Sequence, residues 1–569
     1  MKASFMRLWR WWRQTFARHE LLRWLVTRTP CAAPAQGNGL VMIQIDALSR
    51  GQFNAALEAG EMPFLRVLLR DRDYRLYSHY SGMPSTTPAV QGEILYGVRV
   101  AVPAFEYYDA ECGERVSMLE PHAARAVERR LARAHRGALA GGSVYAGIYS
   151  GSAAETHFCA SDLQPARLWR PANPLVLAVT FLLYFPSFVR IVFLAFIELL
   201  VAQYDALRGW WHARDLWEEL KMAYVRAGVC VALREWSTLG VMIDVARGLP
   251  VIQVTYLGYD EQAHHRGPAS RYAHWSLQGI DGCIRRIYNA AQRSNPGCYR
   301  FLIYSDHGQE TVRFYADETG DDLGAAIERA LNGAVPGARP FRLDTRNERA
   351  ERLAGLAFIG LRRMAEHLRG PRLAAQRGLR VCAQGPLGHV YCQPPLDDSA
   401  RTRCAEALVY TARVPLVLAV AGGEVHAWNT AGMHRLPRDA AAVFGKAHPF
   451  LANVARDMMD VVRHEDAGEL VLCGWRTDNP PLTFARERGA HGGPGYEETH
   501  GFALLHPAIA LPEDAGVVPF EGTPPNRVDP SMAHAPDGEN ASPLPRGVLR
   551  PEILYAVARA HAGDREDTC

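Results

Sequence analysis

The stretch Leu40-Val-Met-Ile-Gln-Ile45-Asp46 decides the fold of this chain. A short, almost continuous apolar run of this kind predicts a strand buried on both faces, as in a parallel sheet. Two further apolar runs, 251–257 and 299–304, also end just before acidic residues, Asp260 and Asp306. Ligands of open α/β sheets bind beyond the carboxyl ends of the strands. The three carboxylates are therefore expected to meet in one crevice.

Sequence patterns around these strands divide the chain into core segments and insertions. Helical periodicity separates the three strands, and a Pro-, Gly- and Asn-rich stretch precedes a final helix that is expected to begin near Pro551. The expected segments are a basic amphipathic N-terminal segment and linker (1–37), three parts of a catalytic core (38–110, 249–324 and 466–515), a helical insertion (111–248) with an apolar segment (175–202), an α+β cap (325–465), and a Pro-rich tail with a terminal helix (516–569).

The composition excludes several classes of protein. Of the 569 residues, 48% are apolar and 22% are charged, values typical of a folded protein rather than a disordered one. The 63 basic and 60 acidic residues nearly balance, so no global nucleic-acid-binding surface is expected. The 11 cysteines form no CxxC pair, which favours a reducing compartment over a disulfide framework.

Three short motifs supply residues that can bind metal ions. Asp260 and His264 are four residues apart, so on a helix they face the same way and can hold one cation such as zinc. The segment Ser305-Asp306-His307-Gly308 places a carboxylate and an imidazole at a strand end, and Gly489-Ala-His491-Gly-Gly493 adds a third imidazole. Each motif alone is more often a surface, capping or loop feature. Together with Asp46 they give three carboxylates and three imidazoles, enough for two metal ions.

A hydroxyl-rich segment completes the set of candidate residues. The sequence Gly82-Met-Pro-Ser-Thr86-Thr87-Pro-Ala-Val-Gln-Gly-Glu-Ile-Leu-Tyr-Gly97 places hydroxyls before a helix that is expected to end near Gly97. A helix N-terminus attracts anions, and a hydroxyl placed there beside a metal can act as a nucleophile in phosphoryl transfer. The alternative is that Ser85, Thr86 and Thr87 only provide an N-cap.

The order of these motifs resembles the alkaline phosphatase superfamily, in particular its type I phosphodiesterase/nucleotide pyrophosphatase branch. A group of bacterial alkaline phosphatase family proteins is similar in the stretch after the hydroxyl motif, in Pro103-Ala-Phe105, and in the last Gly-x-His-Gly-Gly motif. The resemblance covers about residues 38–110, 249–312 and 485–507. It implies an alkaline-phosphatase-like α/β/α sandwich with a central, mostly parallel sheet, interrupted by a helical insertion and a small α+β cap.

The resemblance also implies a role for each candidate residue. One divalent metal ion would be held by Asp260, His264 and His491, and the other by Asp46, a threonine, Asp306 and His307. Both ions would be zinc, with manganese as the alternative. The threonine would attack phosphorus and form a phosphoenzyme, which water would then hydrolyse.

The chain departs from the family at the nucleophile motif, Thr-x-Pro-Asn. Matching the proline selects Thr86, whereas matching the spacing to the terminal glycine selects Thr87, which we prefer. The family's asparagine is replaced by Ala89 or Val90, which leaves the preference for diesters or monoesters open. Gln91 could substitute as a substrate-binding donor, or it could be a solvent-facing helix residue.

Two apolar features point to a membrane surface. Residues 5–18 form a basic amphipathic pattern with tryptophan on the apolar side, which suits either a membrane surface or packing on the chain's own domain, and a standard signal peptide is not expected. The run 175–202 cannot cross a bilayer once, because the candidate ligands on either side of it must meet at one site. Two interpretations of this run remain: a re-entrant or interfacial helical pair bent at Pro186, or a hydrophobic cap buried at a dimer interface. The first option places the protein on the cytoplasmic side of the membrane, peripheral or monotopic.

These observations favour a two-metal hydrolase of phosphoric esters. A comparison of its activity on a phosphodiester and on a phosphomonoester would test this prediction. The alternatives are a phosphomonoesterase or other transferase on the same fold, and a non-catalytic membrane-associated scaffold. A sulfatase is disfavoured because no Cys/Ser-x-Pro-x-Arg motif accompanies the hydroxyl site. The substrate and the oligomeric state stay open.

Overall fold

The computed structural model describes residues 39–111, 113–162, 227–335, 340–343, 377–477, 480–512 and 547–562, and the single residues Phe185, Val189, Val192, Phe193 and Phe196. The predicted N-terminal helix, the remainder of the apolar run 175–202 and most of the Pro-rich tail lie outside these ranges. Within the described ranges, no helix combines the length and apolarity that a bilayer crossing requires.

An eight-stranded sheet forms the centre of the molecule, and it is mostly parallel, as predicted. The strand order is β21-β2-β20-β8-β1-β7-β5-β6, and β20 runs antiparallel to both of its neighbours. The strands are β21 (Val548–Leu549), β2 (Arg75–Tyr80), β20 (His500–Leu505), β8 (Tyr299–Tyr304), β1 (Gly39–Ile45), β7 (Val251–Tyr256), β5 (Ser143–Tyr145) and β6 (Glu155–His157). The apolar run that opens with Leu40 is therefore the inner strand β1, paired in parallel with β7 and β8.

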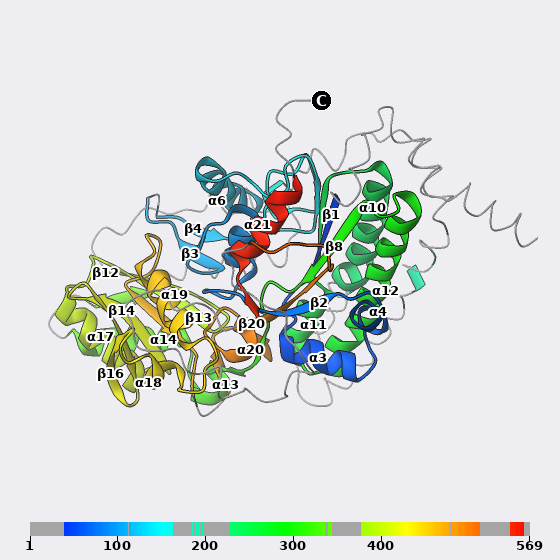
Figure 1. The fold of residues 1–569 in the computed structure, drawn as a ribbon. Coiled ribbons are helices and arrows are strands. Elements are labelled where there is room, and N and C mark those ends of the chain that lie inside the picture. Colours follow the sequence, from blue (N-terminus) through cyan, green and yellow to red (C-terminus); the bar gives the residue numbers. More distant parts are fainter. Residues whose placement is uncertain are drawn as a thin grey trace, which may run out of the picture.

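Helices cover both faces of this sheet, which confirms the expected α/β/α sandwich (Figure 1). Leu40 and Met42 of β1 face one layer, and Val41, Ile43 and Ile45 face the other, because successive side chains of a strand point to opposite faces. The first layer contains α5 (Thr87–Tyr96), α6 (Pro121–Ala134) and α21 (Pro551–Ala562). The second contains α3 (Arg50–Glu58), α4 (Pro63–Asp71), α10 (Arg234–Arg247), α11 (Gly258–Arg266) and α12 (Arg271–Ser294).

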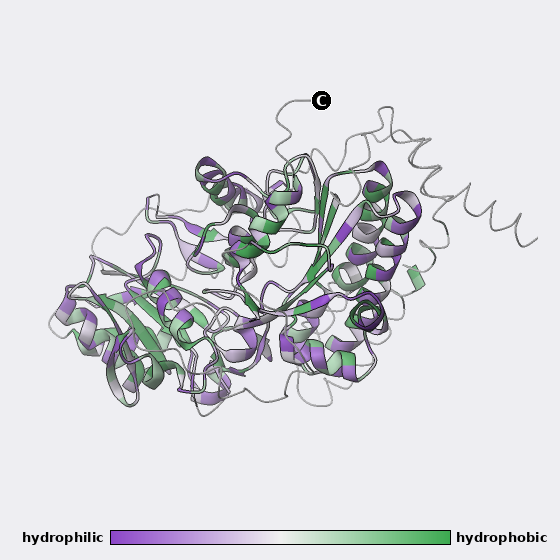
Figure 2. Cartoon of the chain, in the orientation of Figure 1, coloured by the Kyte–Doolittle hydropathy of each residue, from purple (hydrophilic) through white to green (hydrophobic). Residues whose placement is uncertain are grey.

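A second, seven-stranded sheet lies beside the first, at the lower left of Figure 1, and we call it the cap sheet. Its strand order is β11 (Phe341–Leu343), β12 (Arg377–Gln384), β13 (Leu387–Gln393), β17 (Leu470–Cys473), β14 (Leu416–Ala421), β15 (Glu424–Asn429) and β16 (Gly432–Leu436). On one face lie α14 (Leu323–Ala334) and α17 (Asp398–Tyr410), and on the other lie α18 (Ala440–Phe444) and α19 (Leu451–Arg463). In Figure 2 the strands of both sheets are largely hydrophobic, whereas the helices carry mixed colours.

Two boundaries differ from those expected from the sequence. The cap sheet extends past residue 465, because β17 is inserted between β13 and β14. The expected helical insertion 111–248 contains β5 and β6, which belong to the central sheet, and α10, which packs on it. The strands β5 and β6 have three residues each, too short for a recognisable period-2 pattern.

A buried ion-pair network holds α5 against the rest of the molecule. The Arg550 guanidinium lies 2.8 Å from Glu93 of α5 and 3.0 Å from Asp457 of α19, and the Tyr80 hydroxyl at the end of β2 donates to Asp457. All four side chains are buried. Buried charges that lose one partner are strongly destabilising, so the network fixes the position of α5, which carries the hydroxyl motif.

Candidate metal centre

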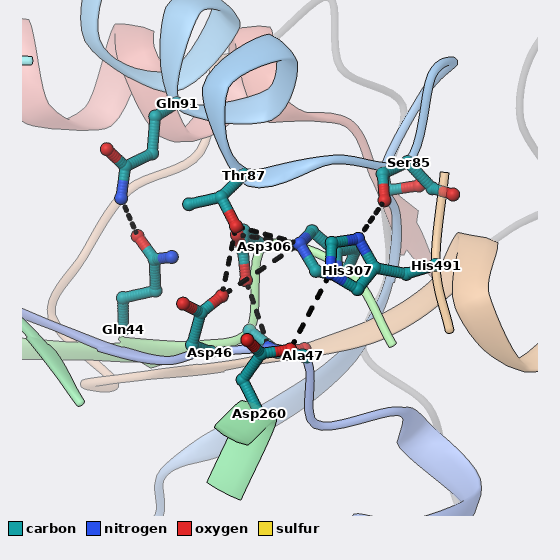
Figure 3. Close-up of polar contacts among 12 residues, drawn as sticks. Gln44, Asp46, Ala47, Ser85, Thr87, Gln91, Asp260, Asp306, His307 and His491 are labelled. Atoms are coloured by element: carbon teal, nitrogen blue, oxygen red, sulfur yellow. Dashed lines mark hydrogen bonds and ion pairs between the residues drawn. The ribbon is translucent and has the colours of Figure 1, made fainter. Parts of the chain in front are cut away.

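The candidate ligands gather at one edge of the central sheet, where β1, β7 and β8 end. Asp46 directly follows β1, and Asp306 and His307 follow β8. Asp260 and His264 lie on α11, which begins just after β7, and His491 follows the two-residue strand β19 (Gly489–Ala490). Figure 3 shows the side chains of Asp46, Asp260, Asp306, His307 and His491 pointing toward one another. Residues more than 440 positions apart are thereby brought into one site.

The ligands form two groups of three, each with one donor atom per residue and all three atoms within 4.8 Å of one another. We call Asp260, His264 and His491 the outer cluster, and Asp46, Asp306 and His307 the inner cluster. The two clusters touch, because the rings of His307 and His491 stack with centroids 4.1 Å apart. The three side chains of the outer cluster are between 10% and 23% exposed, whereas none in the inner cluster exceeds 3%.

The spacing of the donor atoms suits a tetrahedral cation. Metal–ligand bonds of about 2.0–2.1 Å at tetrahedral angles place neighbouring donor atoms about 3.3 Å apart. In the outer cluster, Oδ1 of Asp260 lies 3.3 Å from Nε2 of His264 and 3.6 Å from Nε2 of His491. In the inner cluster, Nε2 of His307 lies 3.3 Å from Oδ2 of Asp306 and 3.9 Å from Oδ1 of Asp46.

The inner cluster also contains an oxygen that needs a partner. Oδ2 of Asp306 is buried and has no hydrogen-bond partner among the described residues. Leaving a buried carboxylate oxygen unpaired is costly, and a bound cation is one of the few ways to satisfy it. The residues present therefore fit a divalent metal ion.

The electrostatics of the inner cluster point the same way. Burial, reinforced by the neighbouring Asp306 and Asp260 carboxylates, raises the pKa of Asp46 well above its ordinary value, and burial raises the pKa of Asp306 to about 6. Burial lowers the pKa of His307 to about 4, which keeps the ring neutral and able to bind a metal. Two crowded carboxylates and a neutral imidazole are a combination that a divalent cation stabilises.

The outer cluster is charged differently. Burial opposes ionisation of Asp260, but His264 and then His491 outweigh it and hold the pKa of that carboxyl below its ordinary value. Burial, reinforced by His307, lowers the pKa of His491 to about 3. Burial would also lower the pKa of His264, but Asp260 and then Glu487 raise it well above its ordinary value. Glu487 is thus the one strong electrostatic partner of this cluster that the motifs did not include.

The two candidate nucleophiles occupy different surroundings. Thr87 begins α5, and its Oγ1 lies 3.1 Å from Nε2 of His307 and donates to Oδ1 of Asp46 at 3.4 Å. Thr86 is the N-cap residue of the same helix, but its hydroxyl makes no capping hydrogen bond and has no partner among the described residues. A simple capping role for the hydroxyl motif therefore does not account for either threonine. The helix ends at Gly97, as expected from the sequence.

Ser85 connects the hydroxyl motif to the loop that carries His491. Its Oγ donates to the carbonyl oxygen of Gly493 and accepts from the N–H of Gly492, while its own carbonyl oxygen accepts from Nδ1 of His491 at 3.0 Å. Gly492 has a φ of +119°, a conformation that other residues rarely adopt. The buried Glu498 accepts from the N–H of Gly493 and from Ser85. These contacts fix the direction in which His491 points.

Short ladders join the loops that carry the two clusters. The strand β9 (Glu310–Thr311) pairs with β19, and β10 (Arg313–Phe314) pairs with β18 (Leu482–Thr483). Gly308 lies at the start of this region, and a Cβ there would be 2.1 Å from the carbonyl oxygen of Glu497. The structure therefore requires a glycine at this position for close packing.

Two further polar residues contact the outer cluster and were missed in the sequence. Nε2 of Gln309 donates to Oδ1 of Asp260, and an Oε2 of Glu487 lies 2.5 Å from Nδ1 of His264. Gln309 directly follows the Asp-His-Gly motif and Glu487 lies four residues before His491. Their proximity to these motifs is the only signal the sequence offers.

Gln91 lies away from both clusters. Its amide donates to Gln44 and accepts from the N–H of Ile148, and the side chain is fully buried (Figure 3). It is therefore neither a solvent-facing residue nor a donor free to bind a phosphate. Ala89 and Val90, which replace the asparagine of the resemblance, are buried in the core.

A third group of potential ligands lies outside the site. Glu155, His157 and Asp244 are close together, but the Arg247 guanidinium binds both carboxylates and the Tyr145 hydroxyl donates to Asp244. The Arg247 hydrogen bonds lower the pKa of Glu155 to about 2. This group is therefore an ion-pair network.

Comparisons with known proteins give structural matches alone. No protein-family model matches the chain, and no curated protein matches it. A phosphonoacetate hydrolase from Sinorhizobium meliloti is 15% identical, with a TM-score of 0.42, and the match covers 93% of this chain and 97% of that one. The ectonucleotide pyrophosphatase/phosphodiesterase 5 of mouse is 9% identical, with a TM-score of 0.42, and that of human is 10% identical, with a TM-score of 0.40; each match covers 91% of this chain and 93% of the other. The chain's own topology shows a mixed α/β fold built on a large, mostly parallel sheet.

Proposed function

We propose that this chain is a two-metal hydrolase of phosphoric esters, of the phosphodiesterase/nucleotide pyrophosphatase type within the alkaline phosphatase superfamily. The observation that carries the proposal is the position of the Thr87 hydroxyl, within 3.4 Å of two side chains of the inner cluster. A scaffold would need neither a hydroxyl at that place nor two complete sets of ligands beside it.

Each cluster would hold one divalent ion. Zinc is the ion we favour, because the donor set of imidazoles and carboxylates is typical of zinc sites, and manganese is the alternative. Two such ions stabilise the negative charge that develops on the entering and leaving oxygens during phosphoryl transfer.

Thr87 acts as the nucleophile. Its Oγ1 forms a bond to phosphorus while the bond from phosphorus to the ester oxygen breaks, and the proton of the hydroxyl is directed at Oδ1 of Asp46. The N-terminus of α5 favours the negative phosphoryl oxygens, because its first N–H groups have no partner within the helix. Water then hydrolyses the phosphate ester of Thr87 and restores the hydroxyl.

The proposal is tested with zinc-reconstituted protein and two substrates, bis(p-nitrophenyl) phosphate and p-nitrophenyl phosphate. We expect faster turnover of the diester. Thr87→Ala is expected to lower kcat by at least about 10³-fold, because the nucleophile is removed. The matched control is Thr86→Ala, one residue away, which should retain activity within about tenfold.

Several results would count against this assignment. Hydrolysis of neither substrate by protein containing two zinc ions would contradict the proposed activity. Faster hydrolysis of the monoester would favour a phosphomonoesterase. A phosphoryl group trapped on Thr86 would show that the roles of the two threonines are reversed.

We also propose that the enzyme works at a membrane surface. Phe185, Val189, Val192, Phe193 and Phe196 are helical, and each is at least 50% exposed. On a continuous helix, 100° per residue would place these five positions within an arc of about 100°, as on the apolar face of an interfacial helix. We expect the protein to float with vesicles that contain anionic lipid, and Phe193→Asp with Phe196→Asp to reduce that binding. Equal recovery of the double variant and the wild type would contradict the proposal.

A further inference from the structure

The two clusters contain three imidazoles. In each of them Nδ1 faces away from the cluster, and the hydrogen-bond partner of Nδ1 differs among the three. Nδ1 of His491 bonds the carbonyl oxygen of Ser85, and Nδ1 of His307 bonds the carbonyl oxygen of Gly308. Nδ1 of His264 lies 2.5 Å from a carboxylate oxygen of Glu487 and 3.0 Å from the carbonyl oxygen of Gly489. Within the described contacts, His264 alone has a carboxylate behind it.

Both partners of Nδ1 of His264 can only accept hydrogen bonds. Nε2 faces the outer cluster, 3.3 Å from Oδ1 of Asp260. A metal ion bound at the outer cluster would take the place of a proton on Nε2. The partners of Nδ1 keep a proton on that nitrogen, which is the tautomer that a metal ligand requires.

The backbone holds Glu487 in this position. The N–H of Arg488 donates to the carbonyl oxygen of His264 at 2.8 Å, and the N–H of Val312 donates to the carbonyl oxygen of Arg488 at 3.0 Å. The next residues form β19, which pairs with β9. Glu487 is therefore held by the residues that directly follow it, and its side chain is only 15% exposed.

We infer that Glu487 is a positioning residue that sets the metal affinity of the outer cluster through His264. The inference rests on the proposed two-metal function. A carboxylate behind a metal-binding imidazole fixes its orientation and increases its basicity, and removing such a partner typically costs 10–100-fold in metal affinity. Loss of Glu487 should therefore weaken one of the two zinc sites and leave the other unchanged.

The test measures zinc binding rather than turnover. Two variants, Glu487→Ala and Glu487→Gln, are titrated with zinc in competition with a chromophoric chelator. The matched control is Glu261→Ala, on the same helix α11, where Glu261 lies 3.8 Å from the neighbouring His265 and outside both clusters. Glu487→Gln keeps an oxygen that can accept from Nδ1, so it separates orientation from charge.

The expected result is one zinc equivalent bound about 10–100-fold more weakly in Glu487→Ala, with an intermediate loss in Glu487→Gln and none in Glu261→Ala. Cobalt-substituted protein should show a changed absorption band for that equivalent alone. Two zinc affinities within about twofold of the wild type in both Glu487 variants would overturn the inference. If the wild type itself binds fewer than two zinc ions, the proposed function fails together with the inference.

Discussion

The outer and inner clusters use similar ligands, but they are built differently. The inner ligands lie at the ends of β1 and β8, neighbouring strands of the central sheet, and their side chains are at most 3% exposed. The outer ligands lie on α11 and on a loop after β19, and they depend on Glu487, Gln309 and Ser85 for their orientation. The sheet itself positions the inner cluster, whereas added polar contacts position the outer cluster. Metal affinity and solvent access can therefore be changed at the outer cluster without altering the core.

The largest expected effect comes from removing an outer ligand. Asp260→Ala and His491→Ala should each abolish turnover, by at least about 10³-fold, and lose one zinc equivalent, because two remaining ligands hold zinc poorly. Activity is measured on the diester substrate and zinc by elemental analysis, with Glu261→Ala as the control. Full activity with two zinc ions in either variant would remove that residue from the site.

An intermediate effect is expected when zinc is withdrawn from the wild type. Because the outer ligands are partly exposed, a chelator should remove one zinc ion at least about tenfold faster than the other, whose release requires local opening of the structure. Stopped-flow measurement with a chromophoric chelator resolves the two phases. If Glu487→Ala accelerates only the fast phase, that phase belongs to the outer cluster. Release of both ions in one phase would show that the clusters do not differ in access.

The smallest expected effect concerns Glu310, in the strand β9 that joins the two clusters. Burial, reinforced by Glu498 and Glu497, raises the pKa of Glu310 from its ordinary value of 4.5 to about 8. The folded state therefore holds this proton more tightly than the unfolded state, so the stabilisation is complete below pH 4.5 and is lost as the pH rises through 8.

Glu310→Gln removes this titration but keeps the oxygen that accepts from the N–H of Glu497. Between pH 5 and pH 8.5 the Tm of the variant should fall less than that of the wild type, by about 2 °C. Thermal melts at matched ionic strength provide the measurement. Parallel curves of Tm against pH would show that Glu310 does not titrate in this range.

The sequence predicted the parts of the site that follow local rules. An apolar run followed by an acidic residue placed Asp46 and Asp306 at one sheet edge, and the four-residue spacing of Asp260 and His264 placed both on one face of what proved to be α11. His491 lies in a glycine-rich motif that carried no such rule; the motif added it as a third imidazole, and only the resemblance to a family gave it a place in one metal site. The α/β/α layers followed from the same strands and from the helical periodicity between them.

The remaining features depend on contacts that no local pattern encodes. Glu487 meets His264 across 223 residues, through a loop held by two-residue ladders. Gln91 is buried because α5 is covered on all sides. A helix of this kind has no amphipathic pattern, so the sequence could not show that Gln91 is shielded from solvent. The strand β17 lies between β13 and β14 in the cap sheet. Which strands it pairs with depends on tertiary packing, so no local pattern of its sequence could indicate this position.

The central claim is that two metal ions are bound around the Thr87 hydroxyl by the two clusters. The most direct measurement is a crystal structure of the zinc-loaded protein with vanadate, using anomalous scattering at the zinc edge. We expect two zinc peaks, each about 2.0–2.2 Å from the donor atoms of one cluster, with vanadium bonded to Oγ1 of Thr87. A zinc peak at only one cluster, peaks elsewhere in the molecule, or vanadate bound away from Thr87 would contradict the claim.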